Sequence, residues 1–397
     1  MPAKILFLAV LHLSCQGETA KPPAPPERIP VLAWGGPPQG ETSAARYREL
    51  AEAGFTHNYS GFSSLEKMQE ALDVAKAAGI KQFVSIPELE KSPEEVGRAL
   101  RAHPALAGYY LRDEPSASDF EKLAAWAKRI TAVDPDHPCY INLFPNYATP
   151  AQLGSATYRE HLDVFIAKVP VPILSFDHYP VVGKSLRPEW YENLELVSAA
   201  ARKSGKPFWA FALAVAHDPY PVATLEHLRL QVFSNLAYGA QGIQYFTYWT
   251  SKSDVWNFHE APISVDGKKT VVYDRVRQVN DEIKNLSAVF KGATVSRPGH
   301  TGTLPRGTQA YQPAAPVTKV ETSGTGAVIS HLVKGAQRAV VLVNRDFLQP
   351  MPFTLTFDGT LGLREFRKDG TTADIAGREW KRDLAPGDIA VVVWDAK

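Results

Sequence analysis

Short apolar segments alternate with amphipathic segments along the first 290 residues of the chain. The apolar segments are rich in Val, Ile, Phe, Tyr and Trp and are four to eight residues long, as is typical of buried strands. Between them, apolar residues recur every three to four positions, as in helices that bury one face. We predict strands in eight segments, at residues 29–34, 54–59, 81–87, 106–112, 138–144, 173–179, 207–214 and 242–249.

Several of the intervening segments carry helix start and stop signals. Ser92 precedes a Pro and two Glu, which is a cap followed by the residues preferred in a first turn. Gly79 has the position of a C-terminal cap. We predict one helix beginning at Ser92 and further helices at residues 43–53, 64–79, 118–133, 189–205, 224–239 and 274–290.

Eight strand segments alternating with helices predict a (β/α)₈ barrel over residues 29–292. A doubly wound open sheet is the alternative, but no Gly-rich phosphate loop follows the first strand. Beyond residue 295 the helical pattern stops. Short apolar runs separated by Gly, Pro and Asp predict a small C-terminal antiparallel β-sandwich over residues 293–397, with strands at 327–332, 339–343, 353–357 and 389–394.

The N-terminus resembles a bacterial lipoprotein signal. Lys4 is followed by an apolar run that ends at Ser14-Cys15, too short to span a bilayer as a mature helix. Residues 1–15 are therefore predicted to be a signal peptide, with Cys15 as the lipidated residue and residues 16–28 as a Pro-rich tether. Ordinary secretion is the alternative. Both place the protein outside the cytoplasm, in the cell envelope, the periplasm or the medium.

Charge and cysteine content exclude several partners. The 43 basic and 42 acidic residues give a net charge of +1, which offers no electrostatic case for nucleic acid or for an anionic membrane surface. Contact with a membrane is expected only through the lipid anchor. Two cysteines make neither a disulfide framework nor a cysteine-based zinc site, and no cluster has metal-ligand spacing. We expect no metal and no cofactor.

Active groups of barrel enzymes come from the carboxyl ends of the strands. The fourth predicted strand ends in Asp113 and Glu114, directly before Pro115. The sixth ends in Asp177, and Glu260 lies in the loop after the eighth. Polar and aromatic residues that could bind a ligand occur at or near the other strand ends: Trp34, Asn58, Tyr59, Asn142, His178, Tyr179, Tyr248, Trp249 and Trp256.

Acids, amides and aromatic rings gathered in one ring of strand ends are typical of a sugar site. Glycosidic cleavage needs one carboxylic acid that protonates the leaving oxygen and a second carboxylate that acts as nucleophile or base. Glu114 can be the proton donor, because burial or the neighbouring Asp113 would raise its pKa. Asp177 is the best second carboxylate, with Glu260 as the runner-up. Simpler roles remain for these acids, since Asp113 could pair with Arg112 and Asp177 could cap a turn.

The segment Gly-Tyr-Tyr-Leu-Arg-Asp-Glu-Pro at residues 108–115 resembles the strand-four signature of clan A glycoside hydrolases. In that clan an Asn-Glu-Pro triplet carries the acid/base Glu, which implies this role for Glu114. Asp113 stands in place of the Asn. The clan's nucleophile Glu at the end of strand seven has no counterpart here, so that role cannot be carried over. Some α-glycosidases pair acids from strands four and six, a pattern that implies Asp113 as nucleophile and Asp177 as acid.

Two further classes of function remain open. The absent strand-seven Glu favours a barrel that has lost catalysis and holds glycans at the cell surface. A hydrolase or lyase outside sugar chemistry is the third possibility, but the chain has no Gly-x-Ser-x-Gly or His-Glu-x-x-His motif. We therefore expect a glycoside hydrolase with a carbohydrate substrate.

Overall fold

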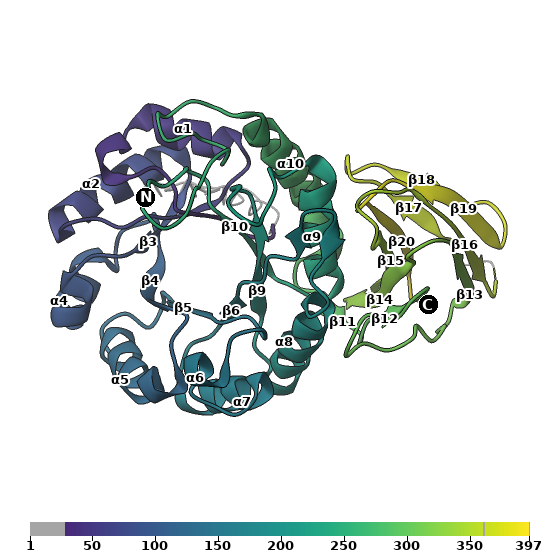
Figure 1. The fold of residues 1–397 in the computed structure, drawn as a ribbon, viewed down its shortest axis with the longest axis horizontal. Helices are drawn as coiled ribbons and strands as arrows, with labels where there is room; N and C mark the ends of the chain where they lie inside the picture. Colours follow the sequence, from purple (N-terminus) through teal and green to yellow (C-terminus); the bar gives the residue numbers. More distant parts are fainter. Residues whose placement is uncertain (1–27, 360–361, 397) are drawn as a thin grey trace, which may run out of the picture.

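Eight parallel strands close into a barrel in the computed structural model, which describes residues 28–359 and 362–396 (Figure 1). β1 pairs with β2 on one side and with β10 on the other, so the sheet has no free edge. The predicted (β/α)₈ barrel is confirmed and the open-sheet alternative is wrong. The strands are β1 (Val31–Trp34), β2 (His57–Tyr59), β3 (Lys81–Val84), β4 (Leu106–Asp113), β5 (Cys139–Leu143), β6 (Leu174–Phe176), β9 (Phe208–Leu213) and β10 (Gly242–Phe246).

Helices form a ring outside the barrel (Figure 1). The Ser43 and Ser64 hydroxyls cap α1 and α2, and Gly79 ends α2 with a φ of +71°. None of the helices in the described part of the chain is long and apolar enough to cross a membrane. The helices are α1 (Ala44–Glu52), α2 (Leu65–Ala78), α3 (Glu88–Lys91), α4 (Pro93–Leu100), α5 (Phe120–Thr131), α6 (Pro150–Leu153), α7 (Tyr158–Lys168), α8 (Trp190–Ser204), α9 (Leu225–Ala237) and α10 (Val271–Phe290), with 3₁₀ turns at Gln39–Glu41 and Ala117–Asp119.

The barrel interior is filled by side chains. Trp34, Phe83, Tyr140, Trp209 and Phe211 belong to one buried cluster inside the strands. A second, larger apolar core lies between the strands and the surrounding helices. The filled interior leaves the carboxyl ends of the strands as the place for a ligand. A small hairpin of β7 (Val181–Val182) and β8 (Ser185–Leu186) is inserted in the loop after β6.

Two antiparallel sheets follow the barrel. The order of the first is β11-β14-β15-β20-β17-β18, with β12 also paired to β14, and the order of the second is β13-β16-β19. Ile329 and Leu342 of one sheet and Leu355 and Trp380 of the other share one apolar core, as expected for a sandwich. The strands are β11 (Thr294–Val295), β12 (Gly299–His300), β13 (Val317–Thr322), β14 (Ala327–Lys334), β15 (Gln337–Asn344), β16 (Met351–Phe357), β17 (Arg364–Phe366), β18 (Thr372–Asp374), β19 (Glu379–Leu384) and β20 (Ile389–Asp395).

The first of these sheets packs on the barrel helices α9 and α10 (Figure 1). Val328, Leu332 and Val341 from the sheet are part of the same apolar core as the barrel helices. Ion pairs cross the same boundary: Arg229 of α9 lies 3.9 Å from Asp388 next to β20, and Lys368 of the sandwich lies 3.8 Å from Glu282 of α10, which also binds Arg229. The predicted signal peptide, the lipidation site Cys15 and the tether up to residue 27 lie outside the described residues, and they stay predictions from the sequence.

Candidate active site

A cavity of about 570 Å³ opens at the carboxyl ends of the barrel strands. It gathers seven of the predicted site residues, among them all three acids of strands four and six. The remaining wall is largely aromatic. The lining residues are Trp34, Asp113, Glu114, Asn142, Phe144, Pro145, Tyr147, Ala148, Gln152, Asp177, Tyr179, Arg187, Phe211, His217, Tyr220, Phe246, Trp256 and Phe258.

Glu114 has an unusual backbone conformation. Asp113 is the last residue of β4, and Glu114 follows it with a φ of +43°. A non-glycine residue in this region costs roughly 1–3 kcal/mol and persists where surrounding contacts hold it, often at functional sites. Here the Glu114 N–H donates to the Asn142 carbonyl at 2.9 Å, which fixes the turn to β5. In the described residues only Glu260 shares this feature among non-glycine residues.

The Asn142 amide joins two of the carboxylates. Its Nδ2 donates to Asp113 Oδ1 at 3.0 Å and to Asp177 Oδ1 at 2.9 Å. Its Oδ1 accepts a hydrogen bond from Ser175 Oγ at 2.9 Å, and Gln244 Nε2 donates to that hydroxyl at 2.8 Å. Because Oδ1 is engaged by Ser175, the amide presents its N–H groups to the acids. Asn142 therefore positions Asp113 and Asp177 relative to each other.

Desolvation raises the pKa of all three carboxyl groups, and neighbouring negative charges add to the rise for Glu114 and Asp177. Burial, aided by the negative charge of Asp113, raises the pKa of Glu114 to about 7. Burial together with the charges of Glu114 and Asp113 raises the pKa of Asp177 well above its usual value, although the Asn142 amide opposes this rise. Desolvation in the cavity also raises the pKa of Asp113, but its side chain is open to solvent and the Asn142 amide opposes this rise. The three groups cannot all ionise at neutral pH, so the site retains a proton.

The raised pKa of Glu114 makes stability depend on pH. The folded chain holds a proton that the unfolded chain loses above pH about 4.5, so this contribution is present at low pH and is lost as the pH rises through about 7. Glu114→Gln removes the ionisation. As the pH rises from 4 to 8, the free energy of unfolding of the variant should increase relative to that of the wild type. The increase should be roughly 1–2 kcal/mol after allowance for solvent in the cavity.

Urea denaturation at several pH values measures this difference. Glu260→Gln is the matched control, because Glu260 is exposed and lies outside the cavity. Its free energy of unfolding should stay close to that of the wild type, because the side chain is exposed. A Glu114→Gln difference that is constant from pH 4 to pH 8 would contradict a buried, proton-retaining Glu114.

Three predicted ligand-binding residues do not reach this cavity. Asn58 is buried on the side of β2 that faces helix α1, where its Nδ2 donates to Gln82 Oε1 at 2.7 Å and to the Tyr47 hydroxyl at 3.4 Å. Tyr248 is fully buried against Phe55. The His178 ring donates its Nδ1–H to Asn193 Oδ1 at 3.0 Å. Successive side chains of an extended segment point to opposite sides, so a residue next to a cavity residue can face away from it.

Of the three others, two lie beside the cavity and one lies outside both hollows. Tyr59 and Trp249 line a neighbouring hollow of about 420 Å³. The Tyr59 ring also contacts Trp34, with ring centroids 4.3 Å apart. Glu260 is exposed and is absent from the lining of both hollows.

The end of β9, the seventh barrel strand, is apolar. Ala212, Leu213 and Ala214 are buried, and none of the acids that line the cavity comes from this strand. Beyond it, His217 lines the cavity, while Asp218 accepts a hydrogen bond from Asn257 at 3.1 Å. The absence of a carboxylate at this strand end, expected from the sequence, therefore holds in the described structure.

The loop residues of the cavity were not predicted from the sequence. Tyr147 follows β5, Arg187 follows the β7–β8 hairpin, and Tyr220 follows β9. No hydrophobic period marks such positions. The other lining residues that were not predicted are Phe144, Pro145, Ala148, Gln152, Phe211, His217, Phe246 and Phe258. Among these, Phe144, Phe211 and Phe246 lie inside predicted strands.

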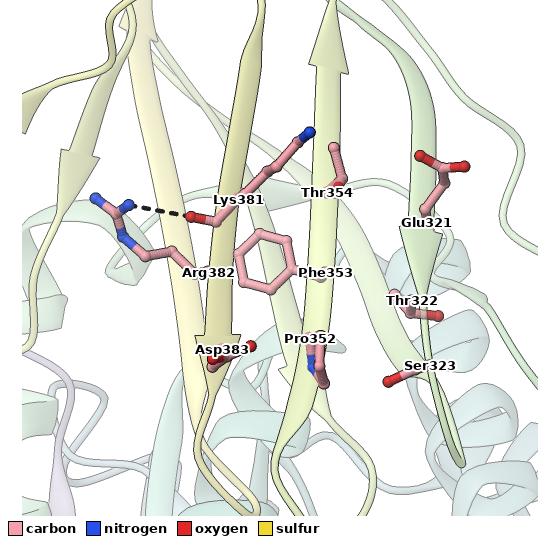
Figure 2. Close-up of a pocket in the computed structure, with 9 residues that line it drawn as sticks. All are labelled: Glu321, Thr322, Ser323, Pro352, Phe353, Thr354, Lys381, Arg382 and Asp383. Atoms are coloured by element: carbon pink, nitrogen blue, oxygen red, sulfur yellow. Dashed lines mark hydrogen bonds between the residues drawn. The ribbon is translucent and has the colours of Figure 1, made fainter.

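Another hollow, of about 480 Å³, lies on the three-stranded sheet of the C-terminal sandwich (Figure 2). Glu321 of β13, Thr354 of β16 and Lys381 of β19 stand side by side across this sheet. Three of its charged residues are paired locally: Lys381 binds Glu379 at 2.9 Å, Glu321 binds Lys319 at 2.7 Å, and Arg382 lies 3.5 Å from Glu365. No group of three or more potential metal ligands occurs in the described part of the chain.

A closed barrel with acids at the carboxyl ends of its strands is the architecture of a (β/α)₈ glycosidase. Residues 63–286, more than half of the chain, match the model of glycoside hydrolase family 42, described as beta-galactosidase. The chain belongs to this family and is a glycosidase. The resemblance to clan A glycoside hydrolases is thereby confirmed. No protein with a curated description matches the chain.

Solved structures of similar fold include three beta-galactosidases. A catalytic mutant of a family 42 enzyme from G. stearothermophilus has a TM-score of 0.64 at 8% identity, over 93% of this chain and 98% of that one. The enzyme from Bacillus circulans sp. alkalophilus has a TM-score of 0.62 at 10% identity, over 92% and 99%. The enzyme from the psychrophilic Marinomonas ef1 has a TM-score of 0.50 at 9% identity, over 66% and 60%. At these identities the likeness shows the fold alone.

Proposed function

We propose that this glycosidase hydrolyses O-glycosidic bonds of an oligo- or polysaccharide, with Glu114 as general acid/base and Asp177 as nucleophile or base. The observation that supports the proposal is the placement of both carboxyl groups in one cavity at the carboxyl ends of the barrel strands. Aromatic rings such as Trp34 and Trp256 line the same cavity and offer faces for a sugar ring.

The hydrogen bonds of the two acids favour this division of roles. In the described residues no hydrogen bond reaches the Glu114 carboxyl group, so its proton is available to a leaving oxygen. A pKa of about 7 keeps a large fraction of Glu114 protonated at neutral pH. Asp177 accepts an N–H from Asn142, which opposes the rise in the pKa of Asp177, and it loses the repulsion of Glu114 when Glu114 holds the proton. The ionised form is the one that a nucleophile or base requires.

The reversed assignment, with Asp113 as nucleophile and Asp177 as acid, has less support. Asp113 and Asp177 accept hydrogen bonds from the same Nδ2 group, so both are stabilised as anions. Asp113 also raises the pKa of Glu114 through its charge. We infer that Asp113 tunes Glu114 and binds a substrate hydroxyl.

A non-catalytic glycan-binding barrel is the second candidate. The apolar end of β9 favours it, because the acid expected there from the clan is missing. A cavity that kept aromatic rings but no working acid pair would bind a glycan without cleaving it.

Assays of the wild-type chain separate the two candidates. We expect release of reducing sugar from at least one member of a panel of aryl glycosides and plant or bacterial polysaccharides. The beta-galactosidases among the similar structures make aryl β-galactosides the first compounds to test. Glycan binding without release across the whole panel would instead support the binding protein.

A further inference from the structure

Arg187 places a positive charge on the wall of a cavity that otherwise gathers acids. It directly follows the β7–β8 hairpin, which is inserted after β6, the strand that leads to Asp177. Its backbone N–H donates to the Pro180 carbonyl at 2.8 Å, so the end of the hairpin is tied to the segment that follows Asp177. Among the described residues that line the cavity, it is the only Lys or Arg.

Two tyrosines hold the guanidinium in place. Arg187 Cζ lies 4.8 Å from the centre of the Tyr147 ring and 5.5 Å from the centre of the Tyr220 ring. Arg187 Nη2 donates to the Tyr220 hydroxyl at 2.9 Å. These contacts reduce the conformational freedom of the side chain before any ligand arrives.

Within the described structure this guanidinium has no acidic partner. No carboxylate lies within ion-pair distance of Arg187, and its buried Nε has no hydrogen-bond partner. Arg345, which stacks on Tyr191, also has no acidic partner in the described residues, but its Nη2 donates to the backbone carbonyls of Thr301, Thr303 and Thr325. Two further stacked arginines are paired with acids. Arg46, over Trp249, binds Glu41 and Glu49, and Arg382, over Trp380, lies close to Glu365. A buried N–H donor without a partner is costly unless a ligand supplies the acceptor.

Tyr147 connects this cation to the acids. Desolvation and the negative charge of Asp177 raise the pKa of Tyr147, and the positive charge of Arg187 opposes this rise. The tyrosine thus lies within electrostatic reach of both groups. A sugar whose glycosidic oxygen meets Glu114 could therefore place a ring substituent near Arg187 in the same cavity.

We propose that the sugar bound in this cavity carries an anionic substituent, the carboxylate of a uronic acid or a sulfate ester, and that Arg187 pairs with it. The guanidinium fork matches the oxygens of either group. Arg187 is then a specificity residue, distinct from the acids that act on the glycosidic bond. The inference rests on the proposed function only in placing a sugar in this cavity.

Calorimetric titration of the Glu114→Gln chain with matched sugars tests the proposal without turnover. The probes are galactose, galacturonate and galactose 6-sulfate, with glucose and glucuronate as a second pair. We expect at least one anionic sugar to bind about 10-fold or more tightly than its neutral partner. Adding Arg187→Gln should lower the affinity for that anionic sugar about 10- to 100-fold and leave the affinity for its neutral partner unchanged. Arg187→Lys should retain part of the preference for the anionic sugar.

Arg382→Gln is the matched control, since Arg382 also stacks on an aromatic ring but lies in the C-terminal sandwich (Figure 2). It should leave every affinity unchanged. The relative affinities for galacturonate and galactose 6-sulfate separate a uronate from a sulfate. The proposal would be overturned by any of three results: equal affinity for neutral and anionic sugars, no binding of any anionic sugar, or an equal loss of affinity for both kinds of sugar in Arg187→Gln. Glu114-dependent hydrolysis of a neutral glycoside would leave the proposed function intact while this inference failed.

Discussion

Glu114→Gln is expected to lower kcat by about 10²–10⁴-fold on substrates whose leaving group is another sugar. Such a leaving group departs poorly unless its oxygen is protonated, and glutamine cannot supply the proton. Aryl glycosides with acidic phenols as leaving groups need less protonation. The loss of rate should therefore shrink as the pKa of the leaving phenol falls.

Steady-state kinetics on a series of aryl glycosides with graded phenols measure this dependence. Glu260→Gln serves as the control for an acid-to-amide change in an exposed loop, and should match the wild type. Binding of the sugar to Glu114→Gln should remain close to that of the wild type. Wild-type turnover by the variant on a sugar leaving group would exclude Glu114 as the acid.

Asp177→Asn should also lower kcat by about 10²–10⁴-fold, but to a similar extent for good and poor leaving groups. An amide is neither a nucleophile nor a base of useful strength, whatever the leaving group. The fold should tolerate the change, because asparagine has the same shape and its amide oxygen can still accept from Asn142. The same aryl glycoside series, run beside Glu114→Gln, makes the comparison.

The control variants assign the partner acid. If Glu260→Gln is inactive and Asp177→Asn retains turnover, the second carboxylate is Glu260. Asp113 is the nucleophile and Asp177 the acid if two results are found together. The loss of kcat in Asp113→Asn is then independent of the leaving group, and the loss in Asp177→Asn grows as the leaving group becomes poorer. Far-ultraviolet circular dichroism of each variant separates these outcomes from loss of fold.

The barrel was predictable because its strands are buried on both faces. Such strands appear as continuous apolar runs, and all eight runs became β1 to β6, β9 and β10. Helix α7 (Tyr158–Lys168) was not predicted, since its buried positions include His161 among charged neighbours. In the sandwich, β19 escaped detection because Lys381, Arg382 and Asp383 face solvent.

The acids of the site could be located from sequence because they follow strands, and strand ends meet at one face of a barrel. Which neighbour faces the cavity depends on the local backbone. Asp177 lines the cavity, while His178 hydrogen-bonds with Asn193 outside it. The position of Arg187 depends on a hairpin and on two tyrosines from other loops, which no local pattern encodes.

The contact between the sandwich and the helices α9 and α10 bears on how the chain unfolds. Val328, Leu332 and Val341 share a core with the barrel, and Arg229 and Glu282 are nearly buried beside them. Separating the two parts would expose this apolar surface and leave charged groups with altered partners, at a cost in free energy on both sides. The barrel and the first sheet should therefore melt as one cooperative unit, and the sandwich should act as a stabilising buttress for the seventh and eighth repeats of the barrel.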